Sequence, residues 1–129
     1  MNAPLLSAAG WLCALIAFGC IVPEGKPTLI VFTGSDWCNN CRYLDKTVLK
    51  DSAFVRFAAE NTHLIIADFP QKNQQPDSII VRNDSLAFLY NHEGTYPKIV
   101  LVKAETPMQI PFHRQKSQEL IAEIRKYLP

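Results

Sequence analysis

The chain has 129 residues, 48% of them hydrophobic, and this size fits one compact domain with its own core rather than two. Thirteen basic residues stand against 12 acidic ones, which gives a formal net charge of +1. Such a balance provides no overall field to attract polyanions, so no nucleic-acid role is expected.

The first segment, residues 1–22, is apolar, and its stretch from Leu5 to Val22 contains no charged residue. This run predicts a signal peptide or a membrane anchor, although it is at the short edge of what a spanning helix needs. A buried first helix fits less well, because a small domain cannot cover a helix that is apolar on all sides. The residues before Cys20 loosely match a lipoprotein cleavage box, which makes Cys20 a candidate lipidation site. We therefore expect export, with residues 23–27 as a linker.

The domain, residues 28–129, begins with a strand, a turn and a helix that carries two cysteines. Residues 28–32 are rich in β-branched side chains and predict a buried strand, and a turn through residues 34–36 follows. Cys38 and Cys41 then begin a helix that should run from residue 39 or 40 to residue 50. Two thiols at this spacing in one helical turn can close a disulfide ring. The unpaired amides and the positive dipole end of the helix favour an anion there.

This placement predicts redox chemistry by thiol exchange. Cys38, the outer residue, should ionise more readily than a free cysteine and attack as a thiolate, and Cys41 should resolve the mixed disulfide. The same spacing is also half of a zinc site, and a pair with no chemical role is a further alternative. Zinc needs a second pair of ligands, and the other cysteines and the histidines do not match that spacing. We therefore expect no metal and no other cofactor in the resting protein. The residues whose spacings do not match a zinc finger or ribbon are Cys13, Cys20, His63, His92 and His113.

The rest of the chain alternates helical and strand patterns, which is typical of an α/β domain. A helical crossover of about twenty residues separates the first two strands, so they should be parallel and joined by a right-handed connection. The expected elements are a helix from residue 51 or 52, a strand over 63–69, a helix over 77–91, hairpin strands over 98–102 and 108–112, and a closing helix over 117–128.

Two motifs resemble the thioredoxin superfamily. Trp37-Cys38-x-x-Cys41 directly after an apolar strand is similar to its active site, and Thr95-Tyr96-Pro97 before a strand resembles its cis-proline loop. The sequences of residues 32–38 and 67–70 are more similar still to a branch of small exported bacterial thioredoxin-like proteins. The resemblance covers about residues 27–128. It implies a minimal thioredoxin fold, a central four-stranded mixed sheet flanked by helices, because the extra first strand and helix of complete thioredoxins have no room here.

The resemblance also implies roles for residues around the cysteines. Pro97 would follow a cis peptide bond opposite the disulfide, although an ordinary trans proline is the alternative. The backbone of Tyr96 would pair with an extended substrate segment. Trp37 would shield the sulfur pair and contact substrate, or it would only pack. We therefore regard Trp37, Tyr96 and Pro97 as candidate substrate-binding residues.

The sequence departs from the family pattern at two places. Asn39 and Asn40 stand between the cysteines, in place of the Gly-Pro of thioredoxin and the Pro-His of strong oxidants. Phe32 occupies the position where many thioredoxins carry a buried acid. Proton transfer from Cys41 is then left to water, to Asp68 or to another group.

These observations together predict a thiol:disulfide oxidoreductase that works through a mixed disulfide on Cys38. The resemblance to the exported branch implies that it reduces disulfides of exported proteins. The resemblance implies a monomer in the bacterial periplasm or at the outer face of the inner membrane. A thiol donor in the membrane would supply it with electrons. The alternative is a copper- or haem-maturation thiol chaperone of the same fold, in which the cysteine pair binds Cu(I). That alternative requires a third ligand near Pro97, for which His92 is the candidate.

Overall fold

The computed structural model describes residues 25–129, so the expected signal or anchor over residues 1–22 lies outside the described residues. Within the described range, no helix has both the length and the apolar character that crossing a membrane requires.

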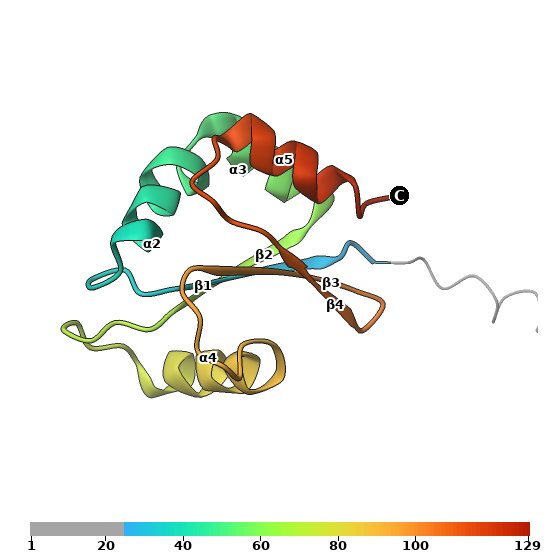
Figure 1. Ribbon diagram of the computed structural model, residues 1–129. Helices are drawn as coiled ribbons and strands as arrows, with labels where there is room; N and C mark the ends of the chain where they lie inside the picture. The colour runs from blue at the N-terminus through green and yellow to red at the C-terminus, as the bar shows by residue number, and fades with distance from the viewer. Residues whose placement is uncertain (1–24) are drawn as a thin grey trace, which may run out of the picture.

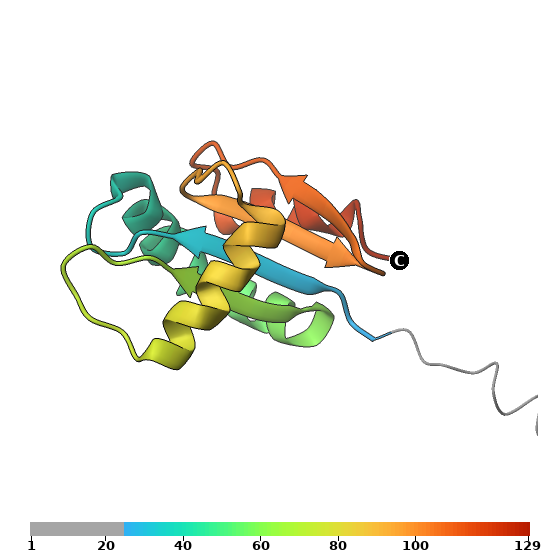
Figure 2. The same ribbon diagram turned by 90° about the horizontal axis from the view of Figure 1, so that it is seen from below.

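The centre of the fold is a four-stranded sheet in the order β2-β1-β3-β4. β1 pairs in parallel with β2 and antiparallel with β3, and β4 is antiparallel to β3. Figure 2 shows β1 between its two neighbours, and its residues from Leu29 to Phe32 are at most 1% exposed. The predicted mixed sheet, with the first two strands parallel, is confirmed. Its strands are β1 (Thr28–Thr33), β2 (His63–Asp68), β3 (Lys98–Lys103) and β4 (Thr106–Ile110).

Helices cover both faces of this sheet, as Figure 1 shows. One face lies under α2, η1, α3 and α5, and the opposite face lies under α4 alone. The helix that carries the cysteines has the predicted extent, but its second half, η1, winds as a π-helix. The helices are α2 (Asn39–Leu44), η1 (Asp45–Leu49), α3 (Ser52–Asn61), α4 (Asp77–Tyr90) and α5 (Ser117–Arg125).

The alternation of β1 divides the core in two, because successive side chains of a strand point to opposite faces. Leu29 and Val31 join the larger cluster, and Ile30 and Phe32 join the smaller one under α4. The larger cluster takes its helical members from positions at helical spacing on α3 and α5. These members are Phe54, Phe57 and Ala58 on α3 and Leu120, Ile121 and Ile124 on α5.

The hairpin before α5 differs from its prediction. The expected second strand over 108–112 begins instead at Thr106, because the chain reverses within two residues, Ala104 and Glu105. Both have positive φ, 48° and 65°, which is the geometry of a type I′ turn. The sequence hides this turn because neither residue is Asn or Gly. Because β4 begins at Thr106, Pro107 lies inside this strand. β4 is at the edge of the sheet, and an edge strand tolerates proline.

The closing helix is shorter than predicted. α5 ends at Arg125 rather than at residue 128, and the last residues form tighter turns in which Tyr127 N donates to Ile124 O at 3.0 Å. Leu128 still packs against the larger core cluster, as its apolar spacing predicts. The spacing thus identified the buried face correctly and placed the helix end too late.

Candidate active site

A tight turn connects β1 to the helix that carries the cysteines. The backbone N–H groups of Trp37 and Cys38 both donate to Gly34 O, at 3.3 and 2.9 Å. The indole of Trp37 folds back over Gly34, so that a Cβ at position 34 would overlap the ring. Glycine at this position therefore allows the Trp37 side chain to lie against the turn.

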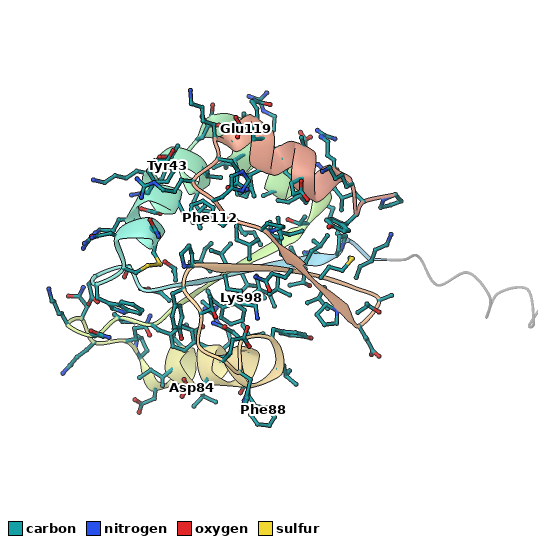
Figure 3. The ribbon with its side chains drawn as sticks, viewed as in Figure 1. Tyr43, Asp84, Phe88, Lys98, Phe112 and Glu119 are labelled. Carbon is teal, nitrogen blue, oxygen red and sulfur yellow. A yellow bond between two sulfur atoms is a disulfide. The ribbon has the colours of Figure 1, made fainter. Side chains whose placement is uncertain are left out.

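Cys38 and Cys41 form a disulfide at the start of α2, with their Cα atoms 5.2 Å apart. Figure 3 shows this bond in yellow at the beginning of the helix. Cys38 is the N-cap residue, and its Sγ accepts a hydrogen bond from the Cys41 N–H at 3.2 Å. Cys38 is 8% exposed and Cys41 is 1% exposed, so Cys38 is the outer sulfur of the pair.

Ser35 and Trp37, on either side of Asp36, are tied to the end of β2. The Asp68 carboxylate accepts from Ser35 N at 2.9 Å and from Ser35 Oγ at 2.6 Å. The Trp37 Nε1–H donates to Phe69 O at 2.7 Å. These bonds join the turn before Cys38 to a segment more than thirty positions later, with separations of 33 and 32 residues.

Asp36 fixes the next part of the same loop. Its carboxylate accepts three backbone N–H bonds, from Gln71 at 2.9 Å, Lys72 at 2.8 Å and Asn73 at 3.0 Å. The bond from Gln71 is the largest cause that lowers the pKa of Asp36 below its usual value; desolvation opposes it, and the other two bonds add to it. This contact was not predicted from the sequence. Its only sequence signal is an acidic residue in the turn between a strand and a helix.

The candidate substrate-binding residues lie together beside the cysteines. The peptide bond between Tyr96 and Pro97 is cis, as the resemblance implies. The Tyr96 ring meets the Trp37 ring edge-on at 5.3 Å and the Phe69 ring at 5.6 Å. Lys98, which follows Pro97 in the chain, pairs with Phe32 near the end of β1. Trp37, Tyr96 and Pro97 therefore belong to one edge of the sheet, although 59 positions separate the first two in sequence.

Buried Asn91 holds the loop before Pro97. Its Nδ2 donates to Thr95 O and its Oδ1 accepts from Thr95 N, both at 3.0 Å. Asn91 is 2% exposed, so both halves of its amide are satisfied inside the protein. Lys98 forms an ion pair with Glu93 of the same loop. The loop is thus fixed at both ends by side chains that sequence reasoning did not single out.

A cavity of about 150 Å³ reaches Cys41 from the side of β2. This volume exceeds the roughly 30 Å³ that one water occupies in the liquid, so water fits. Two carboxylates, Asp45 and Asp68, line it together with Cys41. The cavity brings Asp68 and Cys41 to one solvent-sized space, as a proton route between them requires.

The metal-binding alternative requires a third ligand beside Cys38 and Cys41, and the described residues do not supply one in that arrangement. Within residues 25–129, no group of three His, Cys, Asp or Glu side chains is placed to hold a metal ion. His92, the candidate third ligand, is exposed and meets the Phe88 ring edge-on, with 6.0 Å between ring centres.

Comparison with known proteins places these features in a family context. A family model described as thioredoxin-like matches residues 23–104, more than half of the chain. Disulfide bond reductase DsbH of Chlamydia pneumoniae is 40% identical over 82 residues, which cover 64% of this chain and 49% of that protein. The chain therefore spans about half the length of this curated relative.

Solved structures give the same picture of the fold. A structure of DsbH oxidoreductase superposes with a TM-score of 0.67 at 28% identity and covers 98% of this chain and 84% of its own. A thioredoxin from Thermus thermophilus superposes with a TM-score of 0.52 at 16% identity, over 93% of this chain and 82% of its own. The second likeness concerns the fold alone.

Proposed function

The chain belongs to the thioredoxin-like family, and on that premise we propose that it is a thiol:disulfide oxidoreductase whose redox pair is Cys38 and Cys41. The observation that carries the proposal is the disulfide between these residues at the start of α2, with Cys38 as the more exposed sulfur. The name of the Chlamydia pneumoniae relative, a disulfide bond reductase, supports the reducing direction.

In this proposal the reaction proceeds by two thiol exchanges. The Cys38 thiolate attacks one sulfur of a substrate disulfide, forming a mixed disulfide and releasing the other substrate sulfur, which takes a proton. Cys41 then loses its proton and attacks Cys38 Sγ. The second substrate sulfur leaves and is protonated. The substrate has gained two electrons and two protons, and the protein ends with the Cys38–Cys41 disulfide.

Several groups around the pair suit these steps. The Cys41 N–H that donates to Cys38 Sγ at 3.2 Å can also donate to a thiolate at that position. The proton of Cys41 leaves through the cavity that Asp68 lines, with water as the carrier. This route uses no buried acid on β1. Phe32 occupies the position where many thioredoxins carry such an acid.

The aromatic cluster beside the disulfide is the proposed substrate contact. Trp37 and Tyr96 offer apolar ring surface next to the outer sulfur, with their ring centres 5.3 Å apart. Pro97 has no backbone N–H, and the neighbouring backbone of Tyr96 pairs with an extended substrate segment. Substrate disulfides thus approach between α2 and the Pro97 loop.

The proposal extends to the cellular setting. The substrates are disulfides of exported proteins, and the protein acts as a monomer in the bacterial periplasm or at the outer face of the inner membrane. The uncharged run from Leu5 to Val22 supports export. Each turnover leaves the protein oxidised, so a thiol electron donor, which we place in the membrane, must reduce Cys38 and Cys41 again.

Reduction of insulin disulfides by the full chain, with dithiothreitol as the electron donor, tests the activity. We expect catalysed turnover that is lost in Cys38→Ser and in Cys41→Ser. The matched controls are Cys13→Ser and Cys20→Ser, which remove a thiol elsewhere in the chain and should leave the rate unchanged. Turnover that survives loss of Cys38 would overturn the proposal.

The direction of the reaction is tested separately, by equilibrating the Cys38–Cys41 pair with glutathione. A reduction potential near the roughly −270 mV of thioredoxin supports a reductase. A value near the roughly −120 mV of DsbA would instead assign an oxidase, because that reduced form is the more stable one.

A further inference from the structure

Two arginine side chains lie against the two asparagines between the cysteines. Arg42 Nη2 donates to Asn39 Oδ1, and Arg114 Nη1 donates to Asn40 Oδ1 at 2.7 Å. Both arginines and both asparagines are exposed to solvent. The two guanidinium groups therefore form an exposed rim beside the residues that separate the cysteines.

Arg114 is held in this position by several independent contacts. Its guanidinium carbon lies 4.0 Å from the centre of the Tyr43 ring, and the Tyr43 hydroxyl donates to Arg114 O at 3.0 Å. Arg114 also has a φ of 64°, in the left-handed region that residues other than glycine rarely adopt. The backbone is thus bent so that this side chain reaches α2.

The loop that carries Arg114 is itself fixed. Buried Gln115 accepts from His113 N at 2.7 Å and donates to Pro111 O at 2.8 Å. Ser117 Oγ at the start of α5 donates to Thr47 O in η1 at 3.0 Å. The loop is therefore attached to the same helix that carries the cysteines, and little side-chain freedom remains to be lost when Arg114 binds a partner.

Carboxylates lie near the rim on the side of Arg42, where Asp45 and Asp68 line the same cavity. Among residues 25–129, neither Arg42 nor Arg114 takes part in an ion pair. The carboxylates nearest to the cysteines in sequence are engaged elsewhere. Asp36 accepts three backbone N–H bonds and Asp45 pairs with Lys50 at 2.9 Å. Each guanidinium has five N–H donors in a planar fork that matches a carboxylate, so several donors stay free.

We propose that Arg42 and Arg114 form a cationic rim that selects substrate segments with Asp or Glu next to the disulfide-bonded cysteine. This inference rests on the proposed function and deepens it, since it names the class of disulfide that the Cys38–Cys41 pair reduces. Opposite charges at such a rim accelerate encounter and fix the register of docking, and salt weakens both effects.

A merely structural role of the arginines makes a different prediction. If Arg114 only pinned its loop to α2, its loss would slow the reduction of every substrate by the same factor. A change in the reactivity of Cys38 would likewise act on all substrates alike. The ratio of rates between acidic and basic substrates therefore isolates the recognition of charge.

The test uses three disulfide-bonded peptides of equal length in which the residues flanking the cystine are Glu, Gln or Lys. Second-order rate constants are measured for the reduced full chain at about 20 mM and about 500 mM salt, which span long and short screening lengths. At low salt we expect the Glu peptide to react about tenfold faster than the Lys peptide, at the lower end of electrostatic steering. At high salt the ratio should fall below about threefold.

The variants assign this preference to the two side chains. Arg42→Gln with Arg114→Gln should bring the ratio close to one, each single change should remove part of it, and Arg114→Lys should retain most of it because the charge remains. Arg56→Gln, at an exposed arginine of α3, is the matched control and should leave the ratio unchanged.

Three outcomes would overturn the inference, and the third is distinguishable from the first two. Equal rates for the Glu and Lys peptides at low salt, or a full preference in the double variant, would overturn the cationic rim while the proposed function stands. Failure to reduce any of the three peptides would overturn the proposed function and this inference with it. Wild-type salt dependence and the Arg42→Gln variant decide the matter even if the changes at Arg114 impair folding.

Discussion

The two faces of the sheet are built differently. The face under α2, η1, α3 and α5 buries 13 apolar side chains in one cluster, whereas the face under α4 buries four. Both cysteines belong to the thicker side, on a helix whose Leu44 and neighbouring Val48 are fully buried. The cysteine pair is therefore carried by the part of the molecule with the most hydrophobic stabilisation.

The α4 side relies more on polar contacts. Asn83, 1% exposed, donates to Asp68 O at 2.9 Å and accepts from Arg82 Nε at 3.0 Å. Phe88 points away from the sheet, as Figure 3 shows, and its exposed fraction is 73%. The segments before and after α4 nevertheless provide Asp68 and the Pro97 loop. The thicker face of the sheet thus positions the two sulfur atoms, and the thinner face positions Asp68 and the Pro97 loop beside them.

The largest effect on folding should come from the thicker face. Phe54→Ala removes a side chain that is 1% exposed in the main cluster, and we expect it to lower the free energy of unfolding by about 3–5 kcal/mol. Urea unfolding followed by circular dichroism measures this loss. A cost under about 1 kcal/mol would show that neighbouring side chains fill the space that Phe54 leaves, and that this face of the sheet is loosely packed.

A smaller loss should follow from the polar contact of α4. Asn83→Ala leaves Asp68 O without this donor in a partly buried position, which should cost about 1–3 kcal/mol. We also expect slower insulin reduction, because the end of β2 that holds Ser35 and Trp37 would loosen. Ser85→Ala on the exposed side of α4 is the control in both assays. Equal behaviour of the two variants would refute the special role of Asn83.

Asp36 ties the turn before Cys38 to the loop after β2, and this tie should make the stability of the fold depend on pH. Its pKa is lowered in the folded protein from the ordinary value of 3.8, so the unfolded chain binds the proton more readily. Its contribution to stability is therefore present above pH 3.8 and disappears as the pH falls through the lower folded value. Asp36→Asn should flatten this part of the stability curve, measured as melting temperature between pH 7 and pH 2. A curve unchanged by Asp36→Asn would contradict the role of the three backbone bonds.

The smallest effect is expected on the outer surface of α4. Phe88→Ser removes a side chain that is 73% exposed, and the free energy of unfolding should change by no more than about 0.5 kcal/mol. Urea unfolding provides the measurement. A loss of several kcal/mol would mean that Phe88 is covered in solution, and the contrast between the two faces would then need revision.

Local patterns were sufficient to predict most of the fold and the cysteine pair. The β-branched run of β1, the turn at Gly34 and the helical spacing after Cys41 are all short-range signals, and each element formed where it was expected. The two-residue turn at Ala104 and Glu105 was missed, because its residues are not the usual ones for positive φ.

The surroundings of the cysteines could not be predicted in the same way. Asp36 binds backbone groups 35 to 37 positions later, and Arg114 binds Asn40 across 74 positions. Periodicity does not register such contacts, because they depend on which loops the sheet order brings to one edge. Only the resemblance to a family brought Tyr96 and Pro97 into the candidate site in advance.

The most direct test of the account is to trap the mixed disulfide. In Cys41→Ser the first exchange can occur but the second cannot, so incubation with a disulfide substrate should leave that substrate covalently attached to Cys38. Mass spectrometry of the tryptic peptides locates the attachment. We expect an adduct at Cys38 that dithiothreitol releases. Absence of an adduct, or attachment only at Cys13 or Cys20, would contradict the proposed reaction.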